Sequence, residues 1–338
     1  MDRRSFLQLS AAALASTAAP LAAGESPTTA TATPSRAAVK TGGIQLIPVD
    51  GKYKVWTKKV GSGKTKVLLL HGGPGCTHEY FECFEDFLPR NEFTFYYYDQ
   101  LGSYYSDQPD DKGLWTVDRF REEVEQVRNG LGLDRFILYG HSWGGMLGIE
   151  YALKYQRHLK GLVISNMTAS VKSYMEYMAV LRGRLSPEDQ QTLEKYEKEE
   201  KYEEADYQAI IFGKLYAQHL CRIVPHPDPV ARTFKHLAAP VYNTMQGANE
   251  FVVTGTFKDW DRWADLPKIK VPTFLSVGRH DEMNVEDIQR MGIKIPTSRV
   301  SVCENGSHLS MYDDQEAYFK GLLRYLRDVE SGAFRASA

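Results

Sequence analysis

A serine flanked by glycines, in the sequence GHSWGG at residues 140–145, offers the clearest chemistry in the chain. Residues 135–139 before it are a short apolar run typical of a strand, and residues 146–155 after it have the apolar spacing of a buried helix. A Gly-x-Ser-x-Gly sequence at such a junction predicts a nucleophile elbow with Ser142 at its apex. The N-terminus of this helix would offer backbone N–H groups to an oxyanion. The alternative is a glycine-rich turn without a catalytic role.

A second glycine-rich turn follows a predicted strand much earlier in the chain. Residues 67–70 are apolar, and HGGPG follows at residues 71–75. Small residues in such a turn let a backbone N–H approach the substrate closely. Gly73 is the expected oxyanion donor, and Gly72 is the alternative. A phosphate-binding loop is a poor reading because no Gly-Lys-Ser/Thr follows.

An acid and a base follow two later strands. Residues 273–278 and 299–302 have the pattern of buried strands, and Asp281 and His308 come just after them. Open α/β sheets place their chemistry beyond the carboxyl ends of strands, so these side chains should meet. The chain order of serine, acid and base is also the order that a nucleophile elbow of this kind uses.

Four further strings accompany these motifs, and together they identify a family. They are YDQLGS at 98–103, NEF at 249–251, GRHD at 278–281 and GSH at 306–308. With the motifs above, they resemble the prolyl aminopeptidase (proline iminopeptidase) family of serine α/β-hydrolases, nearest its tricorn-interacting aminopeptidase branch. The resemblance covers roughly residues 45–330.

The resemblance implies an α/β-hydrolase fold, with a mostly parallel central sheet flanked by helices. It implies Ser142 as nucleophile, His308 as base and Asp281 as the acid that orients the base. The N–H groups of Gly73 and Trp143 would form the oxyanion hole, with the Trp143 ring as a wall of the pocket. No metal or organic cofactor is expected.

Two neighbours of the acid and base remain as alternatives. Glu282 could replace Asp281 as the acid, although Asp281 occupies the family's position. His280 could replace His308, although His280 lies directly beside the presumed acid.

The chain divides into a core and an insertion. Between about residues 167 and 265 the alternation of strands and helices stops, and helical periodicities continue without a convincing strand. We therefore predict a hydrolase core at 43–166 and 266–332 with a helical cap at 167–265. The elements expected in the core are a hairpin at 44–57 with its turn at 49–52, strands at 67–70, 94–98, 161–165 and 271–277, and helices at 117–131 and 315–329.

One acidic residue of the cap has a distinctive setting. Glu250 lies among largely apolar and aromatic residues, where a buried carboxylate needs a positive partner. A substrate α-amine would supply it, and the family resemblance implies this role; the alternative is a solvated surface glutamate. A second carboxylate is usual in the family. The candidates lie in a charged run that also fits a solvated helix face: Glu197, Glu200, Glu203, Glu204 and Asp206.

The N-terminus has the pattern of an export signal. Arg3 and Arg4 form a twin-arginine string, an alanine-rich stretch follows to Leu14, and small residues follow at 19–23. We predict a signal peptide at 1–23, a disordered linker at 24–42 rich in Thr, Ala, Pro and Ser, and a periplasmic location. A flexible cytosolic tail is the alternative. The apolar stretch is too short to span a membrane, and we expect no stable membrane insertion after processing.

Charge and cysteine content limit the partners and the redox chemistry. The chain has 41 Lys+Arg and 43 Asp+Glu, and loss of Asp2, Arg3 and Arg4 changes the net charge from −2 to −3, which gives no case for nucleic-acid binding. The four cysteines, Cys76, Cys83, Cys221 and Cys303, show no metal-binding spacing. In an oxidising compartment Cys76 and Cys83 could pair, but twin-arginine export usually carries proteins already folded in a reducing cytosol, so we expect free buried thiols.

The sequence thus predicts a serine aminopeptidase that releases an N-terminal residue, preferably proline, from short peptides through an acyl-enzyme. One alternative is an amidase or esterase acting on amino-acid amides or other small acyl compounds, since fold does not fix substrate. The other is a non-catalytic binding protein on the same fold. Such proteins usually lose a triad member, whereas this chain keeps a serine, an acid and a base.

Overall fold

The computed structural model describes residues 41–336. The predicted signal peptide and nearly all of the predicted linker lie outside this range. The core begins two residues earlier than predicted, because the first strand starts at Thr41 rather than at residue 43.

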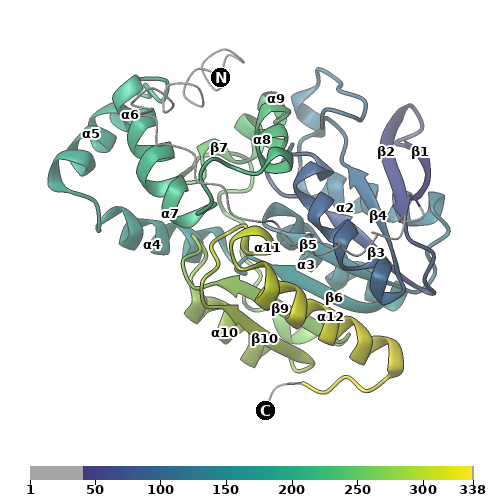
Figure 1. Cartoon of the computed structure of the whole chain (residues 1–338). Coiled ribbons are helices and arrows are strands. Elements are labelled where there is room, and N and C mark those ends of the chain that lie inside the picture. Colours follow the sequence, from purple (N-terminus) through teal and green to yellow (C-terminus); the bar gives the residue numbers. More distant parts are fainter. Residues whose placement is uncertain (1–40, 337–338) are drawn as a thin grey trace, which may run out of the picture.

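One eight-stranded sheet forms the centre of the molecule, in the order β1-β2-β4-β3-β5-β6-β9-β10 (Figure 1). The β1–β2 and β2–β4 pairs are antiparallel, and every pair from β4 to β10 is parallel. The mostly parallel sheet predicted from the sequence is confirmed. Its strands are β1 (Thr41–Val49), β2 (Tyr53–Val60), β3 (Thr65–Leu70), β4 (Phe93–Asp99), β5 (Phe136–His141), β6 (Leu159–Ser165), β9 (Thr273–Gly278) and β10 (Ser298–Cys303).

The hairpin that opens the core turns where the sequence predicts. Asp50 and Gly51 both have positive φ angles, of 53° and 71°, between β1 and β2. Two successive residues in this conformation give a tight turn whose twist matches that of the flanking strands. Aspartate and glycine tolerate the conformation best, so the local sequence fixes the register of the pair.

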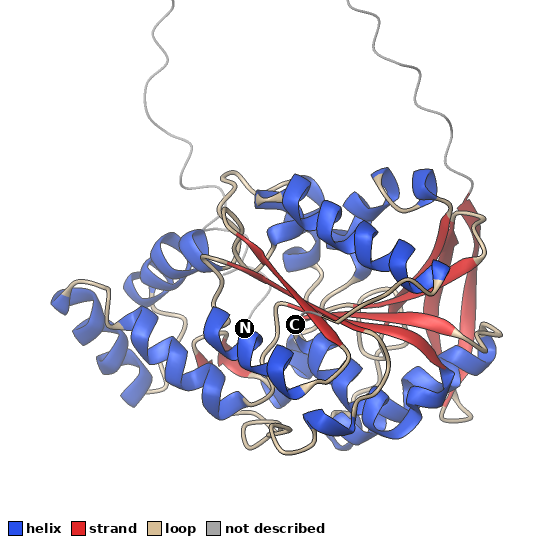
Figure 2. Cartoon of the chain, turned by 90° about the horizontal axis from the view of Figure 1, so that it is seen from below, coloured by secondary structure: helices blue, strands red, loops and turns tan. Residues whose placement is uncertain are grey.

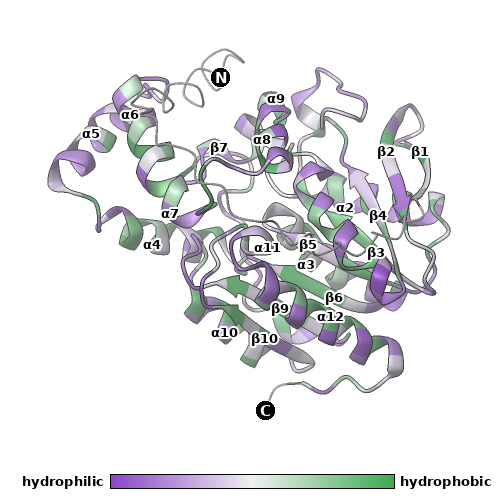
Figure 3. Cartoon of the chain, in the orientation of Figure 1, coloured by the Kyte–Doolittle hydropathy of each residue, from purple (hydrophilic) through white to green (hydrophobic). Residues whose placement is uncertain are grey.

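Both faces of the sheet are buried, and the side chains of each strand alternate between two cores. Leu68 and Leu70 belong to one apolar cluster, and Val67 and Leu69 to the other. Strands buried on both faces read as continuous apolar runs, which is why these segments are recognisable in the sequence. Figure 2 shows helices on both sides of the sheet, and Figure 3 shows the apolar character of the central strands.

Each layer of helices belongs to one of these cores. The first cluster includes residues of α2 (Val117–Gly130), α3 (Trp143–Tyr155) and α10 (Val285–Lys294). The second includes residues of the 3-10 helix η1 (His78–Asp86) and of α12 (Gln315–Ser331). The remaining short core helices are η2 (Pro89–Asn91), η3 (Lys112–Leu114), η4 (Gln156–His158), η6 (Leu266–Lys268) and α11 (Ser310–Asp313).

The cap is inserted between β6 and β9 and forms the teal and green lobe of Figure 1. It is helical as predicted, but it also contains a two-stranded hairpin, which the sequence did not indicate. The strands β7 (Gly247–Asn249) and β8 (Val252–Val253) are antiparallel and too short to show a period. The cap helices are α4 (Val171–Arg182), α5 (Pro187–Lys198), α6 (Ala205–Ile210), η5 (Ile211–Tyr216), α7 (Ala217–His219), α8 (Asp228–Lys235) and α9 (Ala239–Met245).

Two properties of the described range bear on the sequence predictions. None of its helices has the length and apolar character needed to cross a bilayer. The cysteines Cys76, Cys83, Cys221 and Cys303 are all free thiols.

Candidate active site

Ser142 occupies a strained turn between β5 and α3. Its φ and ψ are 56° and −128°, an uncommon conformation for a residue with a side chain. The flanking glycines are needed for this turn: a Cβ on Gly140 would lie 2.0 Å from the Gly144 carbonyl oxygen, and one on Gly144 would lie 2.1 Å from that of Leu70. The GHSWGG sequence therefore folds as the predicted elbow, with Ser142 at the mouth of a cavity.

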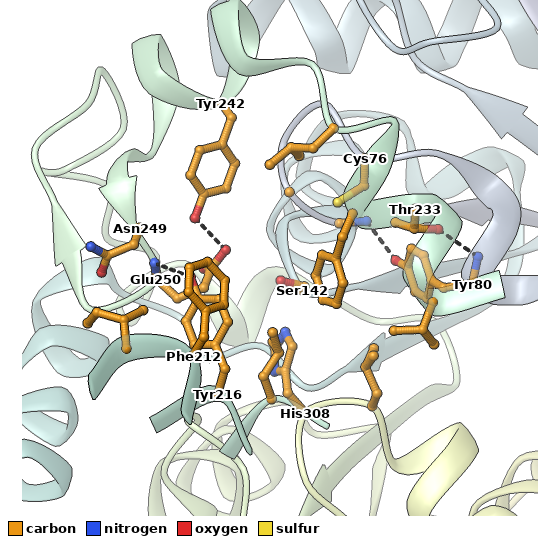
Figure 4. Close-up of a pocket in the computed structure, with 18 of the residues that line it drawn as sticks. Cys76, Tyr80, Ser142, Phe212, Tyr216, Thr233, Tyr242, Asn249, Glu250 and His308 are labelled. Carbon is orange, nitrogen blue, oxygen red and sulfur yellow. Dashed lines mark hydrogen bonds between the residues drawn. The ribbon is translucent and has the colours of Figure 1, made fainter. Parts of the chain in front are cut away.

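His308 and Asp281 form a buried pair after β10 and β9. The His308 Nδ1–H donates to Asp281 Oδ1 at 2.8 Å, which leaves Nε2 for another partner. Asn166 Nδ2 holds the second Asp281 oxygen at 2.5 Å. The alternative base, His280, has an exposed side chain and does not line the cavity. Ser142 and His308 both line the cavity (Figure 4).

The two glycines of the HGGPG turn have different partners. The Gly72 N–H donates a hydrogen bond to Tyr80 Oη at 2.7 Å, so it is not available to an oxyanion. Gly73, at φ 106°, has no backbone partner for its N–H among the described residues and lines the cavity. Trp143 is the first residue of α3, where helix N–H groups have no intrahelical acceptor. These two N–H groups are thus the ones available to an oxyanion.

The Trp143 side chain does not lie where we expected it. Its Nε1–H donates to Gln100 Oε1 at 2.8 Å, and its ring stacks on Phe257 with centroids 5.8 Å apart. It is absent from the lining of the cavity, so the prediction that the ring forms a pocket wall is wrong. The indole instead fixes the start of α3 against the loop after β4.

A buried network joins the three loops that carry these groups. His141, directly before Ser142, contacts the backbone oxygen of His308 through Nε2 at 2.8 Å and Tyr80 Oη through Nδ1 at 3.1 Å. A carbonyl oxygen only accepts, so Nε2 carries the proton and the Tyr80 hydroxyl donates to Nδ1. Burial, with the nearby His308, lowers the pKa of His141 well below its usual value and keeps it neutral. The Tyr80 hydroxyl also accepts a hydrogen bond from the Gly72 N–H, and so joins the HGGPG turn to the elbow.

The cavity lies between the core and the cap and has a volume of about 800 Å³ including its mouth. This is within the range of roughly 300–1,000 Å³ that small-molecule sites occupy. Glu250 is the only carboxylate on its wall, and no lysine or arginine lines it in the described part of the chain. The space is therefore suited to a small ligand that brings its own positive charge.

Glu250 is a constrained residue of this wall rather than a solvated surface glutamate. Tyr242 Oη donates to its Oε1 at 2.6 Å (Figure 4), and Gln246 Nε2 donates to its Oε2 at 3.1 Å. Burial raises the pKa of Glu250, and the hydrogen bond from Tyr242 opposes this only in part. These are neutral donors, so the negative charge of Glu250 has no lysine or arginine partner.

The charged run of the cap does not supply a second carboxylate to the cavity. Glu197 pairs with Arg182 at 2.7 Å, and the remaining candidates are exposed. None of the candidates lines the cavity: Glu197, Glu200, Glu203, Glu204 and Asp206.

A second buried carboxyl group lies beside the base instead, that of Glu282, which the sequence offered only as a substitute acid. It is fully buried, and its Oε1 lies 3.6 Å from His308 Nε2. Neither of its oxygens has a hydrogen-bond partner among the described residues. Burial raises the pKa of Glu282 well above its usual value, and the nearby Glu250 raises it further. The only sequence signal for this residue was its position directly after the acid.

The carboxyl groups of Glu282 and Asp281 change the pKa of His308. Burial disfavours a charged imidazole, but Glu282 and Asp281 outweigh burial and raise the pKa of His308 to about 9. The site thus brings three carboxyl groups, those of Asp281, Glu250 and Glu282, near one imidazole in a buried setting. A ligand ammonium beside Glu250 would disfavour a second positive charge nearby and so favour the neutral form of His308.

Comparison with known proteins agrees with this geometry. A family model described as alpha/beta hydrolase fold matches residues 65–315. The proline iminopeptidase of Elizabethkingia meningoseptica is 44% identical over 297 residues, which cover 86% of this chain and all of that protein. That of Saccharolobus solfataricus is 36% identical over 296 residues, covering 87% and 94%. The crystal structure of proline iminopeptidase from Mycobacterium smegmatis is 30% identical with a TM-score of 0.80, covering 86% of this chain and all of that one. With the elbow, the buried acid–base pair and the carboxylates in place, this chain belongs to the proline iminopeptidase family of serine α/β-hydrolases.

Proposed function

We propose that this protein is a serine aminopeptidase that releases an N-terminal residue, preferably proline, from short peptides or amino-acid amides. The observation that carries the proposal is Glu250, a carboxylate on the cavity wall without a lysine or arginine partner, in the same cavity as Ser142 and His308. An α-ammonium bound by Glu250 would place the first carbonyl of a peptide near the serine. A longer chain on the N-terminal side would have to pass through Glu250 and its tyrosine partners, which explains cleavage after the first residue only.

The proposed reaction uses these side chains in turn. His308 Nε2 accepts the Ser142 proton as the oxygen attacks the carbonyl, and Asp281 stabilises the imidazolium through Nδ1. The N–H groups of Trp143 and Gly73 hold the oxyanion. His308 then protonates the leaving amine as the peptide bond breaks. Water, deprotonated by His308, attacks the acyl-enzyme and returns Ser142 to its starting state.

The test compares a free amine with a blocked one. Wild-type protein should hydrolyse prolyl-β-naphthylamide at least about 100-fold better, in kcat/KM, than its N-acetyl derivative, because the derivative has no charge to bind. A panel of other aminoacyl-β-naphthylamides gives the preference for the first residue. Equal rates with and without the acetyl group would favour the amidase or esterase alternative. Failure of a fluorophosphonate to label the protein would favour a non-catalytic binding protein.

The pH dependence of the site should respond to Glu282. His308 acts as a base only when neutral, so kcat/KM for an uncharged ester such as p-nitrophenyl acetate should rise with pH through a pKa near 9. Glu282→Gln removes a negative charge 3.6 Å from Nε2, which destabilises the imidazolium and lowers this pKa. The acidic limb of the profile should therefore move to lower pH, by about one to three units from Coulomb's law at an effective dielectric constant between about 80 and 20.

The matched control is Glu286→Gln, which removes an exposed carboxylate at the start of α10. Its profile should coincide with that of the wild type. An acidic limb that stays in place in Glu282→Gln would mean that Glu282 does not act on the base.

We further propose that the protein is exported to the periplasm by the twin-arginine route. The arginine pair and the alanine-rich stretch after it support this, and free thiols suit a protein that folds in a reducing cytosol first. Replacing Arg3 and Arg4 together by lysine should leave the precursor in the cytoplasm, as measured by fractionation and immunoblotting. A processed enzyme that still reaches the periplasm would count against the route.

A further inference from the structure

The cavity extends to both sides of the catalytic serine. In Figure 4, Ser142 lies between two groups of side chains, with Tyr242 and Glu250 on one side and Cys76 and Thr233 on the other. The two sides also draw on different apolar clusters. Tyr216 and Tyr242 belong to the first, and Tyr80 and Val230 belong to the second, while Phe234 packs against both.

This division gives the bound substrate a direction, an inference that depends on the proposed function. With the α-ammonium held at Glu250 and the scissile carbonyl at Ser142, the first residue fills the side of Tyr242. The group that follows the scissile bond must then enter the side of Cys76 and Thr233. Ser142, His308 and Asp281 do not select the group that follows the scissile bond. Any preference for that group must therefore come from the walls on this side of the cavity.

One face of α8 forms much of that wall. Val230, Thr233 and Phe234 all line the cavity, and their spacing of three and four residues places them on one side of a helix. Thr233 Oγ1 accepts from the Tyr80 N–H at 3.0 Å, so its hydroxyl is turned toward the core. Leu309, directly after the base, also lines the cavity and belongs to the same apolar cluster as Tyr80 and Val230.

Ion pairs join the outer face of α8 to the helix η1 of the core, and they hold this wall of the cavity in place. Arg232 forms ion pairs with Glu79 at 2.6 Å and with Glu82 at 2.7 Å, and His236 Nδ1 contacts Glu79 at 2.7 Å. Glu79 is almost fully buried, where such a pair is screened much less than on the surface. An apolar surface that is already ordered binds an apolar group at a lower entropic cost than one that must first be ordered.

We propose that this side of the cavity is a subsite for a large apolar group after the scissile bond, so that the preferred substrates carry leucine or phenylalanine, or a comparable apolar amine, in second position. Val230, Phe234 and Leu309 offer apolar contact, whereas the neighbouring polar groups of Tyr80 and Thr233 are engaged with the core. A charged second side chain would lose its hydration here without gaining a partner.

The experiment compares three amides that share the first residue: prolyl-phenylalanine amide, prolyl-aspartate amide and prolinamide. Wild-type kcat/KM should be about 10- to 100-fold higher for the phenylalanine compound than for the aspartate compound, as expected for burial of one large apolar side chain. Phe234→Lys should reduce or reverse this ratio, because Phe234 is half-buried and a lysine there brings a positive charge to the subsite. Phe234→Leu keeps an apolar wall and should retain most of the preference.

The matched control is Val180→Lys, the same kind of change at an exposed position of the cap helix α4. Its preference should equal that of the wild type. Equal wild-type rates for the phenylalanine and aspartate compounds would overturn the subsite while leaving the proposed function intact, since prolinamide would still be cleaved. A ratio unchanged in Phe234→Lys would also overturn it.

Failure of the proposed function gives a different result, namely no cleavage of any of the three amides. The subsite is then tested with ethyl and hexyl acetate. A higher kcat/KM for the hexyl ester that Phe234→Lys removes would support an apolar leaving-group subsite, and equal values for the two esters would overturn it.

Discussion

Replacing Ser142 by alanine should reduce hydrolysis of prolyl-β-naphthylamide to below about 1% of the wild-type rate and abolish labelling by a fluorophosphonate. In the proposed reaction the acyl-enzyme forms on the Ser142 oxygen, and what remains without it is binding and the oxyanion hole, which supply only a small part of the acceleration. Alanine and serine both carry a Cβ, so the strained φ of 56° costs the two residues about the same. The variant should therefore fold, as checked by circular dichroism and thermal unfolding.

A suitable control is Ser173→Ala, which removes a hydroxyl from α4 that bonds to Trp263 and does not line the cavity. It should keep its activity and its labelling. Residual hydrolysis above about 1% in Ser142→Ala, in a folded protein, would show that another group attacks the substrate.

Glu250→Gln should lower kcat/KM for prolyl-β-naphthylamide by about 30- to 1000-fold. Glutamine keeps the size of the side chain and can still accept from Tyr242, but it removes the charge that pairs with the substrate ammonium. A charge-assisted hydrogen bond in a dry site contributes roughly 2–4 kcal/mol to transition-state binding, which corresponds to that loss. Hydrolysis of p-nitrophenyl acetate, which has no amine, should change little by comparison.

The matched control for this variant is Glu197→Gln, because Glu197 is a cap carboxylate that pairs with Arg182 and does not line the cavity. It should have little effect on either substrate. If Glu250→Gln impaired the ester and the prolyl substrate equally, Glu250 would support the structure of the cap rather than the amine. If neither substrate were affected, the aminopeptidase proposal would lose its central residue.

The core of this fold is predictable because its determinants are local. Strands such as β5 and β9 are buried on both faces and appear as uninterrupted apolar runs, and the glycines around Ser142 mark a turn that no other residue type could form. Asp281 and His308 follow such strands, so the topology alone brings them to the same edge of the sheet. The hydrogen bond between them is the geometric result of that placement.

The features that the sequence did not reveal depend on tertiary packing. The direction of the Trp143 ring is decided by Gln100 and Phe257, which are distant in the chain. The hairpin of β7 and β8 has too few residues to show a period. In the sequence, Glu282 has the pattern of an ordinary charged loop residue, and its burial is visible only in the folded structure. Burial and side-chain direction of this kind arise between segments, and no pattern within one segment encodes them.

The cap is joined to the core at a single point of the fold, which allows its sequence to change separately from that of the core. The cap leaves after β6 and returns before β9, and these strands are hydrogen-bonded neighbours, so the whole insertion is one continuous piece of chain attached at a single place. Ser142, Asp281 and His308 all lie outside it, whereas Glu250 and α8 lie inside it. An exchange of this one segment between relatives would thus replace Glu250 and the α8 wall and leave Ser142, Asp281 and His308 unchanged. The cap's share of the cavity wall can therefore change in sequence independently of the groups proposed to break the bond, while Tyr80 and Leu309 of the core remain.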